Sequence, residues 1–240
     1  MKQKIIKTAT HLMAKAAMNY AKNKLQHAGL MQLAKHKEEV WNVGDLVIQN
    51  KTLAVVVDEK TIATIAAQEG KWQFMNSYCP YLHEVGYNGD CGLKTQATSR
   101  SNGAENQFLV ESLIRQLESH TRNTYGCPPP EYYIPAFDFC SSLGAGWYLP
   151  AFDELWNMFS NPLVAAAWRK YASLQSGKDY TNRELQIWSS TDNGHPTSEN
   201  DVNYTEALAL TVSAEGKLSE HSKIKSQPAM IIAFFKLESV

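Results

Sequence analysis

The stretch GAGWYLPAFDELW, residues 144–156, places two adjacent carboxylates, Asp153 and Glu154, shortly after a tryptophan–tyrosine–leucine–proline run. The pair fits either an acid and a base in a reactive site or the first turn of a helix. The side chains of neighbouring helical residues point about 100° apart, which is a poor arrangement for two carboxylates that act on one bond. Carboxylates in a first helical turn interact favourably with its unpaired N–H groups. The stretch therefore favours a structural role, and we predict no catalytic residue in the chain.

The same stretch predicts a corner between a strand and a helix. Residues 147–149 are expected to be extended, and Pro150 suits the first helical position, where an N–H would lack a partner anyway. An upstream helix is expected to end at Gly144, and Asn161-Pro162 is expected to begin another that runs to about Leu174. Four residues are expected to form the buried face of the helix after Pro150: Phe152, Leu155, Trp156 and Phe159.

The flanking sequence indicates an α+β fold. Residues 43–68 contain three short β-branched or apolar runs separated by QNK and DEK, a pattern typical of a three-stranded meander. Residues 105–120 have one apolar helical face. Further strands are expected at QIWSST, at ALALTV and near Leu218, and AMIIAFFKL, residues 229–237, predicts one central strand covered on both faces. Helices followed by strands imply an α+β domain, which we place over residues 39–240.

Charge is distributed unevenly along the 240 residues. Residues 1–37 contain eight lysines and no acidic residue, whereas the rest carries fifteen basic against twenty-four acidic residues, a net charge of −9. An acidic body argues against nucleic acid as the main ligand. The sequence has no run of eighteen apolar residues, so we expect no membrane span.

The basic segment, residues 1–38, is expected to form an amphipathic helical arm, with a second short turn from Leu30 to Ala34. It begins like a secretion signal, but His11 and Lys15 interrupt the apolar stretch, so a cleaved signal is not favoured and the compartment stays open. We expect the arm to pack on its own domain or on another subunit of a homo-oligomer; binding to a membrane surface or an anionic partner is the alternative. The apolar face consists of Ile5, Ala9, Leu12, Ala16 and Tyr20.

Three segments in order carry a family resemblance: YIPAFDFCSSLGAGWYLPAFDELWNMF, IWSSTDN and IIAFFKL. They resemble bacterial domains that read roughly A-x-x-C…G…GW-x-LP-x-x-x-EL, then WSST, then a closing strand. This is the family of the collagen-like adhesin C-terminal domain and its gut-bacterial relatives, the major paralogous (FISUMP) domains. The upstream VGDLVIQNKTLAVVV is similar to the hairpin that opens many of those relatives, so the resemblance spans residues 40–240.

The resemblance implies a C-type lectin-like fold, in the version shared with formylglycine-generating enzymes. The chain departs from the family in lacking an arginine before the closing strand, which weakens a ligand role for that strand. An oxidase of the formylglycine-generating type would need reactive cysteines late in the fold, but no cysteine follows Cys140. Six residues match the family pattern as fold-defining positions: Trp147, Leu149, Pro150, Glu154, Leu155 and Trp188.

The segment STDNGHPTSENDVNY, residues 190–204, is the most ligand-like in the sequence. Amides, carboxylates and an aromatic ring are the groups with which proteins bind sugars or peptides. Glu199 and Asp201 would suit calcium, but no recognised lectin calcium motif is present; a solvated variable loop is the alternative. The residues expected to bind ligand are Asp192, Asn193, His195, Asn200, Asp201, Asn203 and Tyr204.

Two further groups of residues suggest chemistry but lack its usual context. Cys79, His83 and Cys91, with Cys127, offer zinc ligand types without paired C-x-x-C motifs. Ser189-Ser190-Thr191 with His195 lack the strand–nucleophile–helix turn of a hydrolase. We therefore expect no metal and no cofactor.

Three functions follow from these observations. The first is a non-enzymatic binding or adhesion-type module that presents loops to a carbohydrate or protein ligand. The second is a structural or phage-related display protein that oligomerises through its N-terminal helix. The third is an oxidase related to formylglycine-generating enzymes, which the missing late cysteines disfavour.

Overall fold

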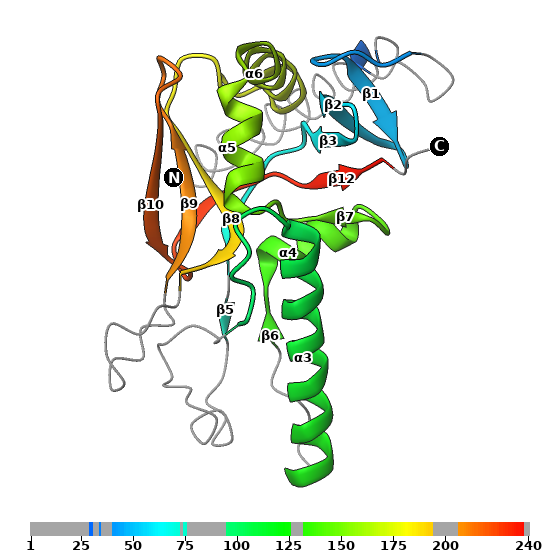
Figure 1. The fold of residues 1–240 in the computed structure, drawn as a ribbon, viewed down its shortest axis with the longest axis vertical. Helices are drawn as coiled ribbons and strands as arrows, with labels where there is room; N and C mark the ends of the chain where they lie inside the picture. The colour runs from blue at the N-terminus through cyan, green and yellow to red at the C-terminus, as the bar shows by residue number, and fades with distance from the viewer. Residues whose placement is uncertain are drawn as a thin grey trace, which may run out of the picture.

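The computed structural model contains helices and two sheets whose strands are mostly antiparallel, as expected for an α+β protein (Figure 1). The arm expected over residues 1–38 lies outside the described residues, apart from residues 29–30 and 34. The structure describes residues 29–30, 34, 40–72, 74–75, 95–125, 132–193 and 206–237.

The first sheet has the strand order β1-β2-β3-β12-β7. Its strands β1, β2 and β3 pair antiparallel in succession and correspond to the meander expected within residues 43–68. Strand β2 is buried along most of its length, because its successive apolar side chains point to opposite faces of the sheet and both faces are covered. The strands are β1 (Leu46–Gln49), β2 (Thr52–Asp58), β3 (Thr61–Thr64), β7 (Trp147–Tyr148) and β12 (Phe234–Lys236).

The second sheet has the order β10-β9-β8-β11-β4, in which only the β8–β11 pair is parallel. A separate pair joins β5 (Phe74–Met75) to β6 (Tyr132–Tyr133). The strands of the second sheet are β4 (Gln68–Lys71), β8 (Leu185–Asp192), β9 (Glu206–Val212), β10 (Leu218–Ile224) and β11 (Pro228–Ile231).

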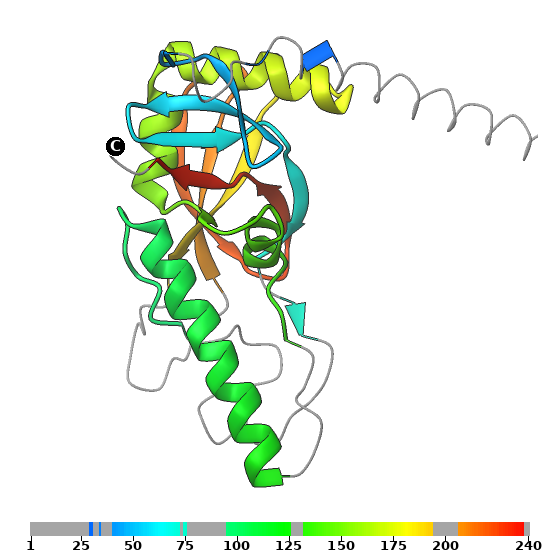
Figure 2. The same cartoon turned by 90° about the vertical axis from the view of Figure 1, so that its right-hand side faces the viewer.

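Four helices with described bounds pack around the sheets. Helix α5 contacts β8, β9 and β10, α6 contacts β2, and α4 contacts β4 and β7. Helix α3 contacts β7 and β8 near its beginning and then extends away from the sheets (Figure 2). Among the described helices, none is long and apolar enough to cross a membrane. Their bounds are α3 (Gly103–Tyr125), α4 (Pro135–Ser142), α5 (Phe152–Ser160) and α6 (Pro162–Ser176).

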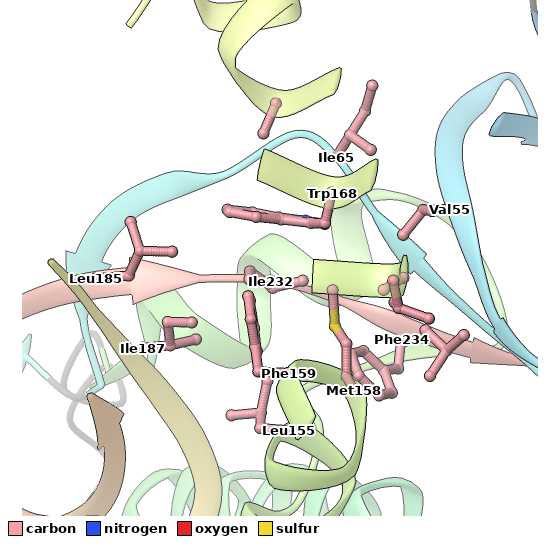
Figure 3. Packing of buried hydrophobic residues seen from close by; sticks show 14 of the residues in the cluster. Val55, Ile65, Leu155, Met158, Phe159, Trp168, Leu185, Ile187, Ile232 and Phe234 are labelled. Atoms are coloured by element: carbon pink, nitrogen blue, oxygen red, sulfur yellow. The ribbon is translucent and has the colours of Figure 1, made fainter. Parts of the chain in front are cut away.

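The core lies on both sides of the first sheet. On one side, Phe159 of α5 and Trp168 of α6 pack with Ile232 between the two sheets (Figure 3). The indole N–H of Trp168 donates to the carbonyl of Thr64 at 3.0 Å, so this buried polar group is paired. On the other side, side chains of β2 and β3 share a second cluster with Val110 of α3 and with Phe137 and Cys140 of α4.

The expectation of one central strand over AMIIAFFKL is wrong. The run divides into β11 in the second sheet and β12 in the first, with Ile232 and Ala233 between them. Strands β3 and β4 divide in the same way, and β12 pairs with β3 while β11 pairs with β4. These two chain segments therefore pass together from one sheet to the other. An uninterrupted apolar run predicts burial but cannot show where a strand changes sheets.

Two residues at the end of the basic arm are part of the core. Leu30 is 3% exposed and Ala34 is 5% exposed, and both belong to the cluster that contains Trp168. The amide of Ala34 donates to the carbonyl of Leu30 at 3.0 Å. The boundary between arm and domain, expected at residue 38, therefore comes after residues that belong to the core.

This placement predicts different outcomes for two truncations. Deleting residues 1–28 keeps Leu30 and Ala34, so it should lower the free energy of unfolding less than a deletion that removes both residues. Deleting residues 1–38 removes both and should cost at least about 2–5 kcal/mol, the usual range for one buried leucine lost to a cavity. Urea denaturation of the two truncated chains measures the difference, and equal midpoints would show that Leu30 and Ala34 do not stabilise the core.

Candidate functional site

Glu154 joins the beginnings of two helices. Its Oε2 accepts hydrogen bonds from the amides of Ala151 at 2.8 Å and Gly103 at 3.0 Å, which lie at the N-termini of α5 and α3. Its Oε1 accepts from the Tyr148 hydroxyl at 3.1 Å and lies 3.6 Å from Nζ of Lys236 on β12. One carboxylate therefore satisfies N–H groups that the two helices leave unpaired.

The contact between the two helices requires a residue without a side chain at position 103. A Cβ atom on Gly103 would lie 2.4 Å from the carbonyl oxygen of Leu149 and 2.6 Å from the amide nitrogen of Ala151. These are backbone atoms that cannot move aside without shifting the corner. Gly103 thus allows α3 to approach the corner closely enough for its amide to reach Glu154.

The corner, residues 149–152, is also bonded to β8. The amide of Ser190 donates to the Pro150 carbonyl at 2.8 Å, and the amide of Phe152 donates to Oγ1 of Thr191 at 3.0 Å. Oγ of Ser189 donates to the carbonyl of Leu208 at 2.7 Å, and all three hydroxyl-bearing residues are buried. The serines and threonine of IWSST therefore make internal hydrogen bonds in the described structure.

Two expectations about the corner are wrong. Pro150 is expected to be the first residue of the helix, but α5 begins at Phe152, after the N-cap residue Ala151. The bond from Ser190 holds Pro150 in the extended segment, which delays the first helical residue. Trp156, expected in the core, is 37% exposed, whereas Met158 is fully buried. The remaining matched positions, Leu149, Leu155, Trp147 and Trp188, are all buried.

Asp153 faces a different set of partners from its neighbour Glu154. Arg100 lies 3.3 Å from Oδ1 of Asp153 and donates to both carboxylate oxygens of Glu220 on β10 at 2.7 and 3.2 Å. All three side chains are about half exposed, so water screens these ion pairs. The two carboxylates of the opening stretch thus make separate structural contacts, and no contact in the described residues joins them into an acid–base pair.

A buried ion pair lies at the end of β8. Oδ2 of Asp192 is 2.9 Å from Nζ of Lys225 and accepts from the hydroxyl and the amide of Thr95 at 2.5 and 3.3 Å. The side chains of Asp192 and Lys225 are only 1% and 2% exposed. We call Thr95, Asp192 and Lys225 the Asp192 cluster. Buried charges are tolerated when they are paired and hydrogen-bonded, as these are.

Trp72 covers the lysine of the Asp192 cluster. Nζ of Lys225 lies 4.5 Å from the ring centroid, a cation–π distance. The indole N–H of Trp72 donates to the carbonyl of Ser189 at 2.8 Å, and its amide donates to the carbonyl of Lys225 at 3.0 Å. Burial lowers the pKa of Lys225 because it disfavours the ammonium form, while the Asp192 carboxylate opposes this effect.

Two of the seven residues expected to bind ligand are described. Asp192 is buried in its cluster, and Asn193 donates from its amide side chain to Oγ of Ser222 on β10. The other five, His195, Asn200, Asp201, Asn203 and Tyr204, lie outside the described residues.

The residues weighed as zinc ligands, Cys79, His83, Cys91 and Cys127, also lie outside the described part of the chain, while Cys140 is buried as a free thiol. Across residues 40–72, 95–125, 132–193 and 206–237, no three His, Cys, Asp or Glu side chains are grouped as a metal site would require.

The sequence reasoning missed Thr95, Trp72 and Lys225. They come from three distant parts of the chain, and none belongs to a recognisable motif. Lys225 follows the strand β10, whose side chains are mostly exposed, so a pattern of alternating residues gives no sign that this lysine is buried.

The different contacts of Asp153 and Glu154 predict different costs of removing them. Glu154→Ala removes the acceptor of two helix N-terminal amides and should lower the free energy of unfolding by about 2–4 kcal/mol. Asp153→Ala removes an exposed ion pair and should cost less than about 1 kcal/mol. Thermal or urea denaturation of both variants measures this, and a larger loss for Asp153→Ala would contradict the assigned roles.

Comparison with known proteins gives little further information. No protein-family model and no curated protein matches the chain. A solved structure of a fimbrial protein from Bacteroides ovatus ATCC 8483 aligns with a TM-score of 0.40 and 12% sequence identity. The alignment covers 74% of this chain and 35% of that chain, so this chain spans well under half the length of the fimbrial protein. Since so low a TM-score does not define a common fold, we base the functional proposal on the chain's own residues.

Proposed function

We propose that the protein is a non-enzymatic binding or adhesion-type module of C-type lectin-like fold that presents residues 193–204 to a carbohydrate or protein ligand. The observation that carries the proposal is the Asp192 cluster. It lies where the chain enters the polar segment that the sequence marks as ligand-like.

One end of a long connecting segment and both ends of another lie at or beside this cluster. One segment leaves β5 after Met75 and returns at Thr95, and the other leaves β8 after Asn193 and returns at Glu206. Thr95 bonds to Asp192 through both its hydroxyl and its amide, and the amide of Asn193 donates to the carbonyl of Glu206 at 3.3 Å. Thr95, Asn193 and Glu206 therefore lie together at one end of β8 and β9.

Such an arrangement suits binding because loops that recognise ligands are usually positioned by a rigid framework. Breaking a buried ion pair by removing one partner typically costs about 3–5 kcal/mol, so the entry point of the segment is firmly held. In this proposal Asp192 supports the segment from inside the protein. Ligand contacts are assigned to Asn193, His195, Asn200, Asp201, Asn203 and Tyr204, whose amides, charges and ring suit hydrogen bonding and stacking.

The lectin-like fold is supported by the contact between its two sequence signatures. The GW-x-LP segment and the WSST strand lie 39 residues apart, yet Phe152 bonds to Thr191 and Pro150 bonds to Ser190. The two segments that carry the family resemblance are therefore joined by hydrogen bonds in the interior.

A binding array of glycans and matrix proteins, probed with the full chain, tests the proposal. For a ligand found there, Asn200→Ala/Asp201→Ala should lose binding while changing the free energy of unfolding by no more than about 0.5 kcal/mol. Glu215→Ala/Lys217→Ala, in the exposed turn between β9 and β10, is the matched control and should bind like the parent. Unimpaired binding by the Asn200/Asp201 variant would move the ligand site elsewhere.

A further inference from the structure

A groove separate from the Asp192 cluster lies between α3, α4 and β7. Its volume is about 290 Å³, and it shares no residue with the segment proposed above. These three elements lie together in Figure 1. The residues that matter for its chemistry are Phe108, Glu111, Ser141, Gly144, Gly146 and Trp147.

One wall presents an aromatic ring to solvent. Phe108 is 64% exposed on α3, although neighbouring Gln107 and Val110 on the same helix are buried. The opposite rim consists of Gly144, Ala145 and Gly146. A Cβ atom added to Gly144 would meet nothing within 4 Å, so the backbone at this residue borders open space, whereas a Cβ atom on Gly146 would lie 2.6 Å from the Phe235 ring.

The groove also contains a carboxylate held in a fixed orientation. Oε1 of Glu111 accepts from Nε2 of Gln107 at 3.0 Å and from Oγ of Ser141 at 2.8 Å. In the described part of the chain, no lysine or arginine forms an ion pair with Glu111. An oriented carboxylate beside an exposed ring is suited to a cation, which can pair with the first and lie over the second.

We propose that this groove binds the side chain of an arginine or lysine carried by a peptide segment. The cationic group pairs with Glu111, the side chain lies along the Phe108 ring, and the peptide backbone follows the glycine rim. The net charge of −9 over residues 38–240 favours approach of a basic segment. This inference stands independently of the ligand proposed for residues 193–204.

The test is an NMR titration of the full chain with the peptide acetyl-Gly-Arg-Gly-amide, with its citrulline analogue as the neutral control. The amides of Gly144 and Gly146 and the indole N–H of Trp147 report on the groove; this indole has no hydrogen-bond partner among the described residues. Glu111→Gln keeps an oxygen to accept from Gln107 and Ser141 but should weaken arginine-peptide binding roughly tenfold. Phe108→Ala should weaken it roughly threefold.

Glu105→Gln, an exposed glutamate on the same helix that does not line the groove, is the matched control and should leave the affinity unchanged. Binding should also weaken as salt is added. The proposal would be overturned by equal affinity for the citrulline peptide or by an unchanged affinity in Glu111→Gln. It would also be overturned if about 10 mM peptide changed no signal, because a site with a Kd of about 1 mM would be nearly saturated at that concentration.

Discussion

The carboxylate of Glu154 connects the beginnings of two helices with two strands of the first sheet. It holds the first amides of α3 and α5, the hydroxyl of Tyr148 on β7 and, more weakly, the ammonium of Lys236 on β12. Desolvation raises the pKa of Tyr148, and the adjacent carboxylate adds to this effect. Because the corner is also bonded to β8, this one acidic residue helps set how both helices and both sheets meet.

The Asp192 cluster has a corresponding role at the end of β8, directly after Ser190 and Thr191, which bond to the corner. It joins three residues separated by tens of positions in the sequence, and Trp72 closes over its lysine. A buried ion pair is a weak source of net stability, but it favours one arrangement of the groups around it when its hydrogen bonds are satisfied. That property suits the base of the proposed recognition surface.

Local patterns in the sequence were sufficient to predict several of the helices and strands and part of the corner. The meander, the helix after Asn161 and the first-turn position of Asp153 and Glu154 follow from periodicity and helix-end chemistry. Long-range bonds could not be predicted from such patterns. The bond from Ser190 to Pro150 displaces the start of α5. The passage of the chain from one sheet to the other divides AMIIAFFKL into two strands. Lys225 could not be identified because its burial depends on Asp192 and Trp72, residues far away in the sequence.

Native-state hydrogen exchange, measured by NMR on the full chain, tests the central claim that Glu154 and the Asp192 cluster fix the framework. The amides of Gly103 and Ala151, which donate to Glu154, and of Asp192, which donates to the Ala97 carbonyl, should exchange only through global unfolding. Their opening free energy should equal that of the Val56 amide in the core strand β2. Exchange of Gly103 and Ala151 through local opening, at free energies far below that of Val56, would contradict the account.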